Sequence, residues 1–315
     1  MDNSEGLGTI ITSGYSVKNK TKSRTNQINL KSMTKITPYL YILPAFLSFG
    51  IFLFYPFFKT IALSFCITNN LGKAKSFVGI RNYVRLFTMH GFSEILIITF
   101  KFALMVIILS MILGFLTANL ANVKGKAFRP FSIVFSVPLA AASSGIALVF
   151  QKMFDPSSGV INKLLHTNLK WFQDPQLALP MVAIVTVWMM SGTNFVFLSA
   201  GLKGIPASLY ESAEIDGAGS LSKLIHITVP GLSPILFFVL TLNIISAFQA
   251  FAQINVMTHG GPGDATNVVV FSIYRDAFFN FRFDFAAAQS VILFVIILAI
   301  TLVQFKNERK MVHYL

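Results

Sequence analysis

Few residues in this 315-residue chain have side chains that catalyse reactions or bind metals. Its one cysteine, Cys66, cannot form a disulfide within the chain. The five histidines all fall outside the long apolar segments: His90, His166, His226, His259 and His313. No Cys/His group has metal-ligand spacing, and no aspartate lies at the middle of an apolar segment, where proton relays and intramembrane proteases need one. The sequence therefore predicts no catalytic residue and no metal site.

Two glycine-containing stretches come near a phosphate-binding loop. Gly125-Lys126-Ala127 has Leu120 where the first glycine should stand, and Gly217-Ala218-Gly219 follows a predicted helix instead of a strand. Neither can cradle a nucleotide. If this protein works against a gradient, its energy must come from another chain.

The most informative polar stretch, YESAEIDGAGS at 210–220, lies between two apolar segments. Pro206 suits the first turn of a helix, and Gly217 suits the left-handed position just past its end. Ser220 is predicted to cap a second helix that Pro230 stops. The pattern predicts two short helices joined by a tight bend.

Such a bend forms a compact, partly apolar knob, with Leu209 and Ala213 on one side and Glu211 and Glu214 available to basic groups. An amphipathic loop on lipid headgroups is the alternative. Anionic headgroups attract Lys and Arg, whereas this stretch carries acids that include Asp216. We therefore expect it to dock on a protein.

The elements around this stretch belong in a bilayer. The chain is 54% hydrophobic and 12% charged, with a mean hydropathy of +0.68, whereas soluble domains are about a quarter charged. A membrane-spanning helix needs roughly 20 apolar residues. Six segments qualify: 38–65, 95–120, 131–153, 177–200, 234–256 and 286–305. The predicted fold class is an all-α membrane protein with six transmembrane helices.

The net charge of +13 is explained by membrane topology. Basic residues cluster before the first span, after the second and after the sixth: Lys18, Lys20, Lys22, Arg24, Lys31, Lys35, Lys124, Lys126, Arg129, Lys306, Arg309 and Lys310. An even number of spans puts these clusters on one side, which the positive-inside rule makes cytoplasmic. Both termini are then cytoplasmic, although Lys73, Lys75, Arg81 and Arg85 fall on the opposite face. No basic stretch is interleaved with stacking aromatics, so we expect no nucleic-acid partner.

The domain organisation follows from these segments. Residues 1–35 are predicted to be a disordered cytoplasmic tail, 36–309 a transmembrane domain with a loop at 201–233, and 310–315 a cytoplasmic C-terminal tail. After the fifth span, Arg275, Asp276, Arg282 and Asp284 are expected to pair locally with one another.

The fifth span carries a stripe of small and polar residues. Asn243, Ser246, Ala250 and Gln253 recur at i, i+3, i+7 and i+10, with Ala247 nearby. In lipid such a stripe faces protein or water: it is either interhelical packing or the lining of a pathway. Trp188, Ser191 and Asn194 on the fourth span are further candidates.

The 210–218 stretch, followed by Ile227-Thr228-Val229-Pro230, resembles the EAA loop of binding-protein-dependent ABC importer permeases. Similarity extends to Gly201-Leu202, Gly260-Gly261-Pro262 and Ala286-Ala287-Ala288, as in the carbohydrate-uptake branch with its maltose-type and glycerol-3-phosphate-type permeases. The one departure is Ser212, where the family has alanine.

The resemblance implies the type I importer permease fold, with a coupling helix that inserts into a separate ATPase subunit. The implied coupling residues are Leu209, Tyr210, Glu211, Ser212, Ala213, Glu214, Asp216, Gly217 and Leu221. It also implies a second permease, which we expect to be a different chain, two ATPase subunits that bind ATP and magnesium, and an extracytoplasmic solute-binding protein. This chain is expected to bind no cofactor and to lie in the bacterial cytoplasmic membrane.

In maltose-type permeases the fifth helix lends amide and small side chains to a sugar site, which favours the pathway interpretation for Asn243. Ala247 and Ala250 stand where related transporters have amides, so that contact set does not transfer directly. The sequence predicts half of a pathway that imports a sugar or oligosaccharide by alternating access, with glycerol 3-phosphate or a phosphodiester as the alternative. A stand-alone channel or an intramembrane enzyme is disfavoured.

Overall fold

The computed structural model describes residues 38–89, 91–122 and 129–312, so the predicted tail 1–35 lies outside it. The chain divides into two units, Met1–Lys59 and Thr60–Leu315. In the first, a helix begins at residue 38 and continues through a π-helical turn, Gly50–Phe54, into α2 (Tyr55–Ser64), which ends in the second unit. The apolar helical run confirms a helix at the first predicted span.

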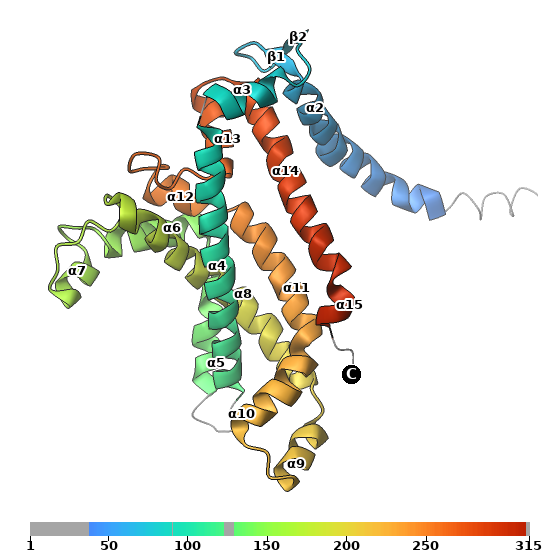
Figure 1. The fold of residues 1–315 in the computed structure, drawn as a ribbon, viewed down its shortest axis with the longest axis vertical. Helices are drawn as coiled ribbons and strands as arrows, with labels where there is room; N and C mark the ends of the chain where they lie inside the picture. Colours follow the sequence, from blue (N-terminus) through green and yellow to red (C-terminus); the bar gives the residue numbers. More distant parts are fainter. Residues whose placement is uncertain (1–37, 90, 123–128, 313–315) are drawn as a thin grey trace, which may run out of the picture. The chain divides into compact units, whose positions relative to one another are not determined.

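One end of the second unit is built from short elements. Strands β1 (Cys66–Thr68) and β2 (Ala74–Phe77) pair antiparallel, and α3 (Arg81–Met89) follows them (Figure 1). The buried Asn82 Nδ2 donates to the carbonyl oxygens of Ser64 and Cys66, at 2.9 and 2.8 Å. These two bonds hold α3 against the strand that follows α2.

Three long helices pack together to form most of the apolar core. They are α4 (Phe92–Ala121), α8 (Pro175–Gly204) and α11 (Val229–Phe248). Asn194 Nδ2 on α8 donates to the Ser110 carbonyl oxygen on α4 at 3.0 Å. A Cβ built on Gly114 would lie 2.6 Å from the Asn194 Cβ, so glycine permits this approach of the two helices.

The third predicted span, 131–153, is not one continuous helix. It consists of α5 (Arg129–Ser136), a 3-10 turn Val137–Ala140 (η3), and α6 (Ser143–Met153), and its two arms are bent by 109°. Pro138 cannot donate the bond that would continue the helix, and Ala141 and Ala142 are extended. Among the described residues, five helices are long and apolar enough to cross a membrane, or six if the bent pair is one span.

The fifth predicted span, 234–256, is also interrupted. Helix α11 ends at Phe248, and α12 (Ala252–Met257) starts after a break. The break turns the Phe251 ring against Tyr274 of α13 (Val269–Tyr274), with the ring centroids 4.8 Å apart. No Gly or Pro marks this position in the sequence, so packing of the aromatic rings accompanies a break that local sequence does not signal.

Further elements of the second unit are α7 (Val160–Leu165), the π-helical turn η5 (Arg275–Phe279), α14 (Phe283–Lys306) and α15 (Glu308–Met311). Gln304 Nε2 on α14 donates to the Phe237 carbonyl oxygen and to Thr241 Oγ1, at 3.1 and 2.8 Å, which holds α14 against α11.

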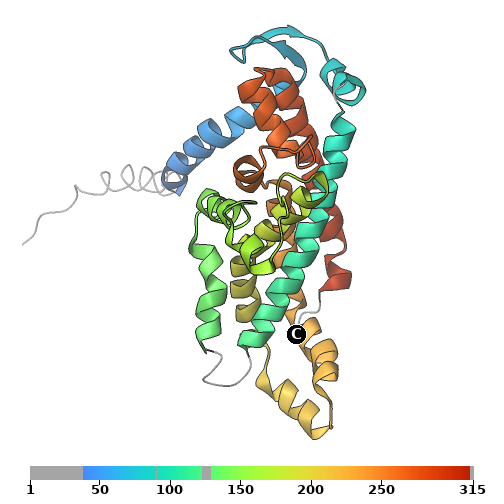
Figure 2. The same cartoon turned by 90° about the vertical axis from the view of Figure 1, so that its left-hand side faces the viewer.

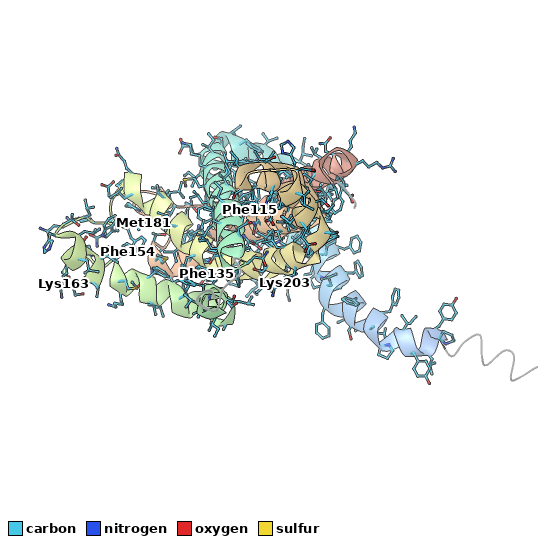
Figure 3. All side chains as sticks on the ribbon, turned by 90° about the horizontal axis from the view of Figure 1, so that it is seen from below. Phe115, Phe135, Phe154, Lys163, Met181 and Lys203 are labelled. Carbon is cyan, nitrogen blue, oxygen red and sulfur yellow. The ribbon has the colours of Figure 1, made fainter. Side chains whose placement is uncertain are left out.

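Figure 3 looks along the molecule from the opposite end to α3 and places Phe154 and Lys163 to one side. The predicted domain boundary at 309/310 falls inside α15 and stays a prediction.

Candidate functional site

Residues 206–228 form a helical hairpin, called here the α9–α10 hairpin, at the end of the second unit opposite to α3 (Figures 1 and 2). It consists of α9 (Ala207–Ile215), α10 (Ser220–Lys223) and a π-helical turn, Leu224–Thr228 (η4). The predicted helix, bend and second helix are therefore present. Gly219, with no side-chain cap, stands at the N-cap position that was predicted for Ser220.

The bend is closed by two backbone hydrogen bonds. Gly217 has φ +74°, the left-handed conformation predicted for it. Its N–H donates to the Glu214 carbonyl oxygen at 3.1 Å, and Ala218 N–H donates to the Ala213 carbonyl oxygen at 2.8 Å. This bond pair is the Schellman arrangement, which satisfies carbonyls that the end of α9 would otherwise leave unpaired.

Side chains join the two arms of the hairpin. The Tyr210 hydroxyl lies 3.0 Å from Thr228 Oγ1, and Lys223 Nζ lies 2.8 Å from Glu214 Oε1. Glu214 is expected to face a partner. Its side chain is 70% exposed even though Oε1 pairs with Lys223, so that expectation stays a prediction. Glu211 and Asp216 are exposed, as is Ser212.

The hairpin presents apolar side chains outward. The exposed fraction is 88% for Ile215, 69% for Leu221, 52% for Ile225 and 38% for Leu209. Exposed large apolar residues grouped on a protruding element mark an interaction surface. The half-buried Tyr210 instead packs on an apolar cluster at the base of the hairpin.

The second arm runs directly into a long apolar helix. The prediction that Pro230 stops this arm is wrong, because α10, η4 and α11 follow one another without a break. A proline inside a helix removes one hydrogen bond and crowds the preceding turn, and the π-helical turn at Leu224–Thr228 stands where that disturbance falls. The hairpin and α11 are thereby joined by one helical rod.

The candidate pathway residues after α10 do not form one stripe. Asn243, Ala247, Ala250 and Gln253 are buried, whereas Ser246 is exposed. Because α11 ends at Phe248, the helical spacing that was predicted to align Asn243 with Gln253 does not hold. Asn243 Nδ2 is buried without a hydrogen-bond partner, and Gln253 Nε2 lies 3.4 Å from Met189 Sδ on α8.

The α8 candidates have different surroundings. The Trp188 ring is half-buried beside Phe150, with the ring centroids 5.2 Å apart, and it lines an apolar cavity of about 590 Å³ between α6 and α8. Ser191 Oγ donates to the Trp188 carbonyl oxygen at 2.6 Å. Asn194 joins α8 to α4, so its observed contacts are packing contacts.

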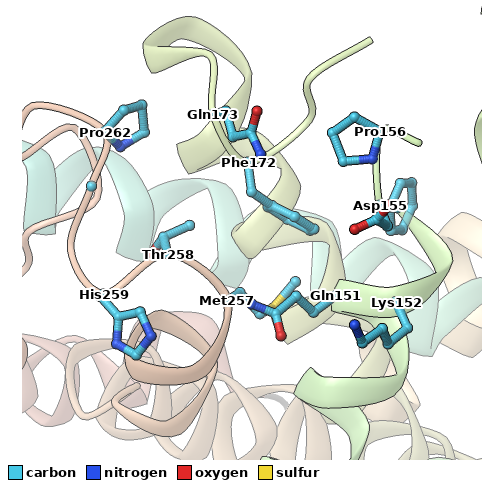
Figure 4. A pocket seen from close by; sticks show the side chains of 12 residues that line it. Gln151, Lys152, Asp155, Pro156, Phe172, Gln173, Met257, Thr258, His259 and Pro262 are labelled. Carbon is cyan, nitrogen blue, oxygen red and sulfur yellow. The ribbon is translucent and has the colours of Figure 1, made fainter. Parts of the chain in front are cut away.

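A cavity of about 460 Å³ lies at the loops between α6, α8 and α12 (Figure 4). It was not predicted from the sequence. Gln151, Asp155, Phe172 and His259 line it, and Gln151 Nε2 donates to the Val256 carbonyl oxygen at 3.0 Å. Asp155 and the residue pair Gly261–Pro262 stand in turn-rich segments, which is the signal that could have pointed here.

Asp155 organises one wall of this cavity. The backbone N–H and hydroxyl groups of Ser158 and Ser157 donate to its Oδ1 at 2.8 to 3.0 Å. These hydrogen bonds, led by that from the Ser158 N–H, hold the pKa of the Asp155 carboxyl well below its ordinary value. Within the described residues no group of three or more His, Cys, Asp or Glu side chains could hold a metal ion.

Comparison with known proteins identifies the family of this chain. Residues 107–312 match the family model of the binding-protein-dependent transport system inner membrane component. The chain belongs to this family. It is therefore a multi-pass permease subunit of an ABC importer of the inner membrane, as predicted.

Relatives match along almost their whole length. The chain is 35% identical to the sn-glycerol-3-phosphate transport system permease protein UgpA of Agrobacterium fabrum, covering 89% of this chain and 97% of that protein. It is 31% identical to UgpA of Yersinia pestis over 88% and 95% of the two chains. A bacterial ABC transporter that imports the acidic polysaccharide alginate has a similar fold, with a TM-score of 0.78 at 22% identity over 89% and 98% of the chains. This likeness confirms the type I importer permease fold.

Proposed function

We propose that this permease is one half of a translocation pathway and that the α9–α10 hairpin seats in a groove of a separate ATPase subunit. The observation that carries the proposal is the hairpin's combination of outward apolar side chains with a bend closed by the hydrogen bonds of the Gly217 and Ala218 N–H groups. A rigid knob can transmit force, whereas a mobile loop would absorb it. The contact residues are the predicted coupling set, with the exposed Ile215 and Ile225 added.

The complex would contain a second permease, most simply a different chain, and two ATPase subunits that bind ATP and magnesium. An extracytoplasmic solute-binding protein would dock at the end that carries α3. Both termini would then be cytoplasmic. The named alginate transporter, whose structure has been solved with a substrate-bound periplasmic protein, supports such an assembly by analogy of fold.

Closure of the ATPase dimer would move the hairpin, and the α10–η4–α11 rod would carry that movement into the membrane. ATP can drive the change because it binds one state of the ATPase dimer more tightly than the other. The π-helical turn η4 is the place in the rod where the hydrogen-bonding pattern changes.

For the solute, we propose a neutral polyhydroxylated molecule, a sugar or an oligosaccharide. The candidate pathway residues Asn243, Gln253 and Trp188 are uncharged; amides bond hydroxyl groups in both directions, and an indole stacks on apolar sugar faces. A second candidate is sn-glycerol 3-phosphate, which is supported by the names of the UgpA relatives. The guanidinium or ammonium group that such an anion needs could come from the second permease.

Transport by the reconstituted complex tests the solute. Proteoliposomes with the matching binding protein are offered radiolabelled oligosaccharides and sn-glycerol 3-phosphate in parallel. ATP-dependent uptake of a sugar that excess glycerol 3-phosphate does not inhibit supports the first candidate. Uptake of glycerol 3-phosphate alone would replace it with the second.

The hairpin assignment has its own test. A cysteine at Ile215 should crosslink to the ATPase, and a cysteine at Phe77, at the opposite end of the second unit, should not. The proposal fails if the Ile215 cysteine reacts with an impermeant reagent from the outer side of the membrane.

A further inference from the structure

A polar cavity of about 340 Å³, called here the α14 cavity, lies between α3, α4, η5 and the start of α14. Its volume is far above the roughly 30 Å³ that one water occupies in the liquid. It is lined by Ser272, Arg275, Asp276, Asn280, Arg282 and Gln289, together with apolar residues of α3 and α4. It shares no residue with the α9–α10 hairpin or with the candidate pathway.

Gln289 leaves an unused acceptor in this cavity. The residue is 1% exposed, and its Nε2 donates to Asp276 Oδ2 at 2.6 Å. Its Oε1 is buried and has no hydrogen-bond partner. Because Asp276 can only accept, this bond sets the orientation of the amide and leaves Oε1 as a buried acceptor in the wall of the cavity, which a donor such as a hydroxyl group would satisfy. The other Asp276 oxygen, Oδ1, accepts from Asn280 Nδ2 at 2.9 Å.

Two guanidinium groups line the cavity. Arg275 and Arg282 bring two positive charges, and Asp276 together with Asp264, which is bonded to Arg275, brings two negative charges. Arg275 Nη1 lies 2.6 Å from Asp264 Oδ1, and the Arg282 guanidinium lies 4.0 Å from the Phe285 ring centroid. Contacts with a carboxylate and a ring hold both guanidinium groups in place. The planar guanidinium fork matches the oxygens of a phosphate.

Exposed aromatic residues follow directly on the same segment. Phe278, Phe279 and Phe281 are 64%, 65% and 53% exposed. The Arg282 N–H donates to the Asp276 carbonyl oxygen at 2.8 Å, and Phe281 just before it has φ +53°. The turn that directs Phe281 outward is thus held by a hydrogen bond to Asp276, a residue that lines the cavity. A polar cavity beside exposed aromatic side chains suits a polar head that is joined to apolar chains.

We propose that the α14 cavity binds a glycerophosphate group, with its phosphate at Arg275 and Arg282 and a hydroxyl donating to Gln289 Oε1. This group has two sources: the headgroup of phosphatidylglycerol and free sn-glycerol 3-phosphate. The proposal does not depend on which solute the permease carries, and it is tested without transport.

The experiment uses the purified permease–ATPase complex without its binding protein. In one arm, native mass spectrometry counts retained phosphatidylglycerol against phosphatidylcholine. In the other, equilibrium dialysis measures binding of radiolabelled sn-glycerol 3-phosphate. Gln289→Leu should weaken binding about tenfold in at least one arm, the effect expected when one hydrogen bond to a buried acceptor is lost. A loss in the first arm identifies the lipid, and a loss in the second identifies the free ester.

The chain offers a matched control. Gln304→Leu alters another buried amide of α14 whose Oε1 also lacks a partner, and Gln304 does not line the α14 cavity. Equal binding by wild type and Gln289→Leu in both arms would overturn the proposal, as would an equal loss in Gln304→Leu. If Gln289→Leu does not assemble, Arg282→Gln decides, with the exposed Arg81→Gln as its charge-matched control. Unchanged binding by Arg282→Gln then overturns it.

Discussion

The Tyr210 hydroxyl lies 3.0 Å from Thr228 Oγ1 and joins the first arm of the α9–α10 hairpin to the base of α11. The two residues are 18 positions apart, on either side of the Gly217 bend. Thr228 Oγ1 is also 3.3 Å from the Lys223 carbonyl oxygen, inside the π-helical turn. This contact ties the first arm directly to the rod that enters the membrane, so the hairpin can move with α11 as one body.

Tyr210→Phe should therefore weaken coupling. The change removes one hydrogen bond, which contributes about 1 kcal/mol, and keeps the ring in the apolar cluster. We expect several-fold lower substrate-stimulated ATP hydrolysis in the reconstituted complex, with basal hydrolysis unchanged. Thr228→Val should have the same effect, and the double variant should be no worse than either single one. Fully additive losses would show that the two groups act separately.

Gly217→Val should abolish stimulated hydrolysis while the chain still inserts in the membrane. Valine at φ +74° is strained by about 1 to 2 kcal/mol or more, which should open the bend. Gly219→Val is the control, because a Cβ at either glycine meets nothing within 4 Å, and Gly219 has φ −70°. Equal stimulated ATP hydrolysis by the two variants would show that coupling does not require the Gly217 bend.

Asn243→Leu should change transport and spare assembly. The buried Asn243 Nδ2 has no hydrogen-bond partner, so leucine removes an unsatisfied donor and the yield of the complex should hold. The KM for uptake should change several-fold. Asn194→Leu serves as the contrast, because it loses the hydrogen bond to Ser110 and crowds Gly114. It should lower the free energy of unfolding of the complex by about 1 to 3 kcal/mol. Wild-type kinetics in Asn243→Leu would remove this residue from the pathway.

The turn at Asp155 should resist acid. Hydrogen bonds from Ser158 and Ser157 lower the pKa of the Asp155 carboxyl, so the stabilisation they give is present above the pKa of the unfolded chain, about 3.9, and is lost only as the pH falls through the lower folded value. Hydrogen exchange at pH 4 should still find the Ser157 and Ser158 amides protected. Asp155→Ala should remove that protection at pH 4 and at pH 7, whereas Ser157→Ala should retain most of it. Rapid exchange at pH 4 in the wild type would contradict the assignment.

Local chemistry made the hairpin predictable from sequence. A left-handed Gly217 after a short helix is a requirement of backbone geometry, and the residues that decide it lie within a few positions of one another. The apolar segments were predictable for a similar reason, because length and composition determine whether a helix can cross a bilayer. The packing of one helix on another could not be predicted in this way, because it does not depend on residues that are close together in the chain.

The interruptions were decided by tertiary contacts. In the third span Pro138 gave a partial signal, but the 109° bend depends on how η3 packs on α8, where a Cβ at Gly192 would lie 2.7 Å from the Leu139 nitrogen. The break after Phe248 has no sequence signal and accompanies the packing of Phe251 on Tyr274. It moves Gln253 off the face of Asn243, which the spacing alone had aligned.

Charge pairing followed the same division. Arg275 was expected to pair with its near neighbours, yet it bonds Asp264, and Asp276 bonds the buried Gln289 of α14. Sequence by itself determined which segments are helical, where the hairpin bends and which family the chain belongs to, because these depend on residues close together in the chain. Only the tertiary structure decided which helices break and which polar groups meet, because those outcomes depend on side chains from distant segments competing for the same space.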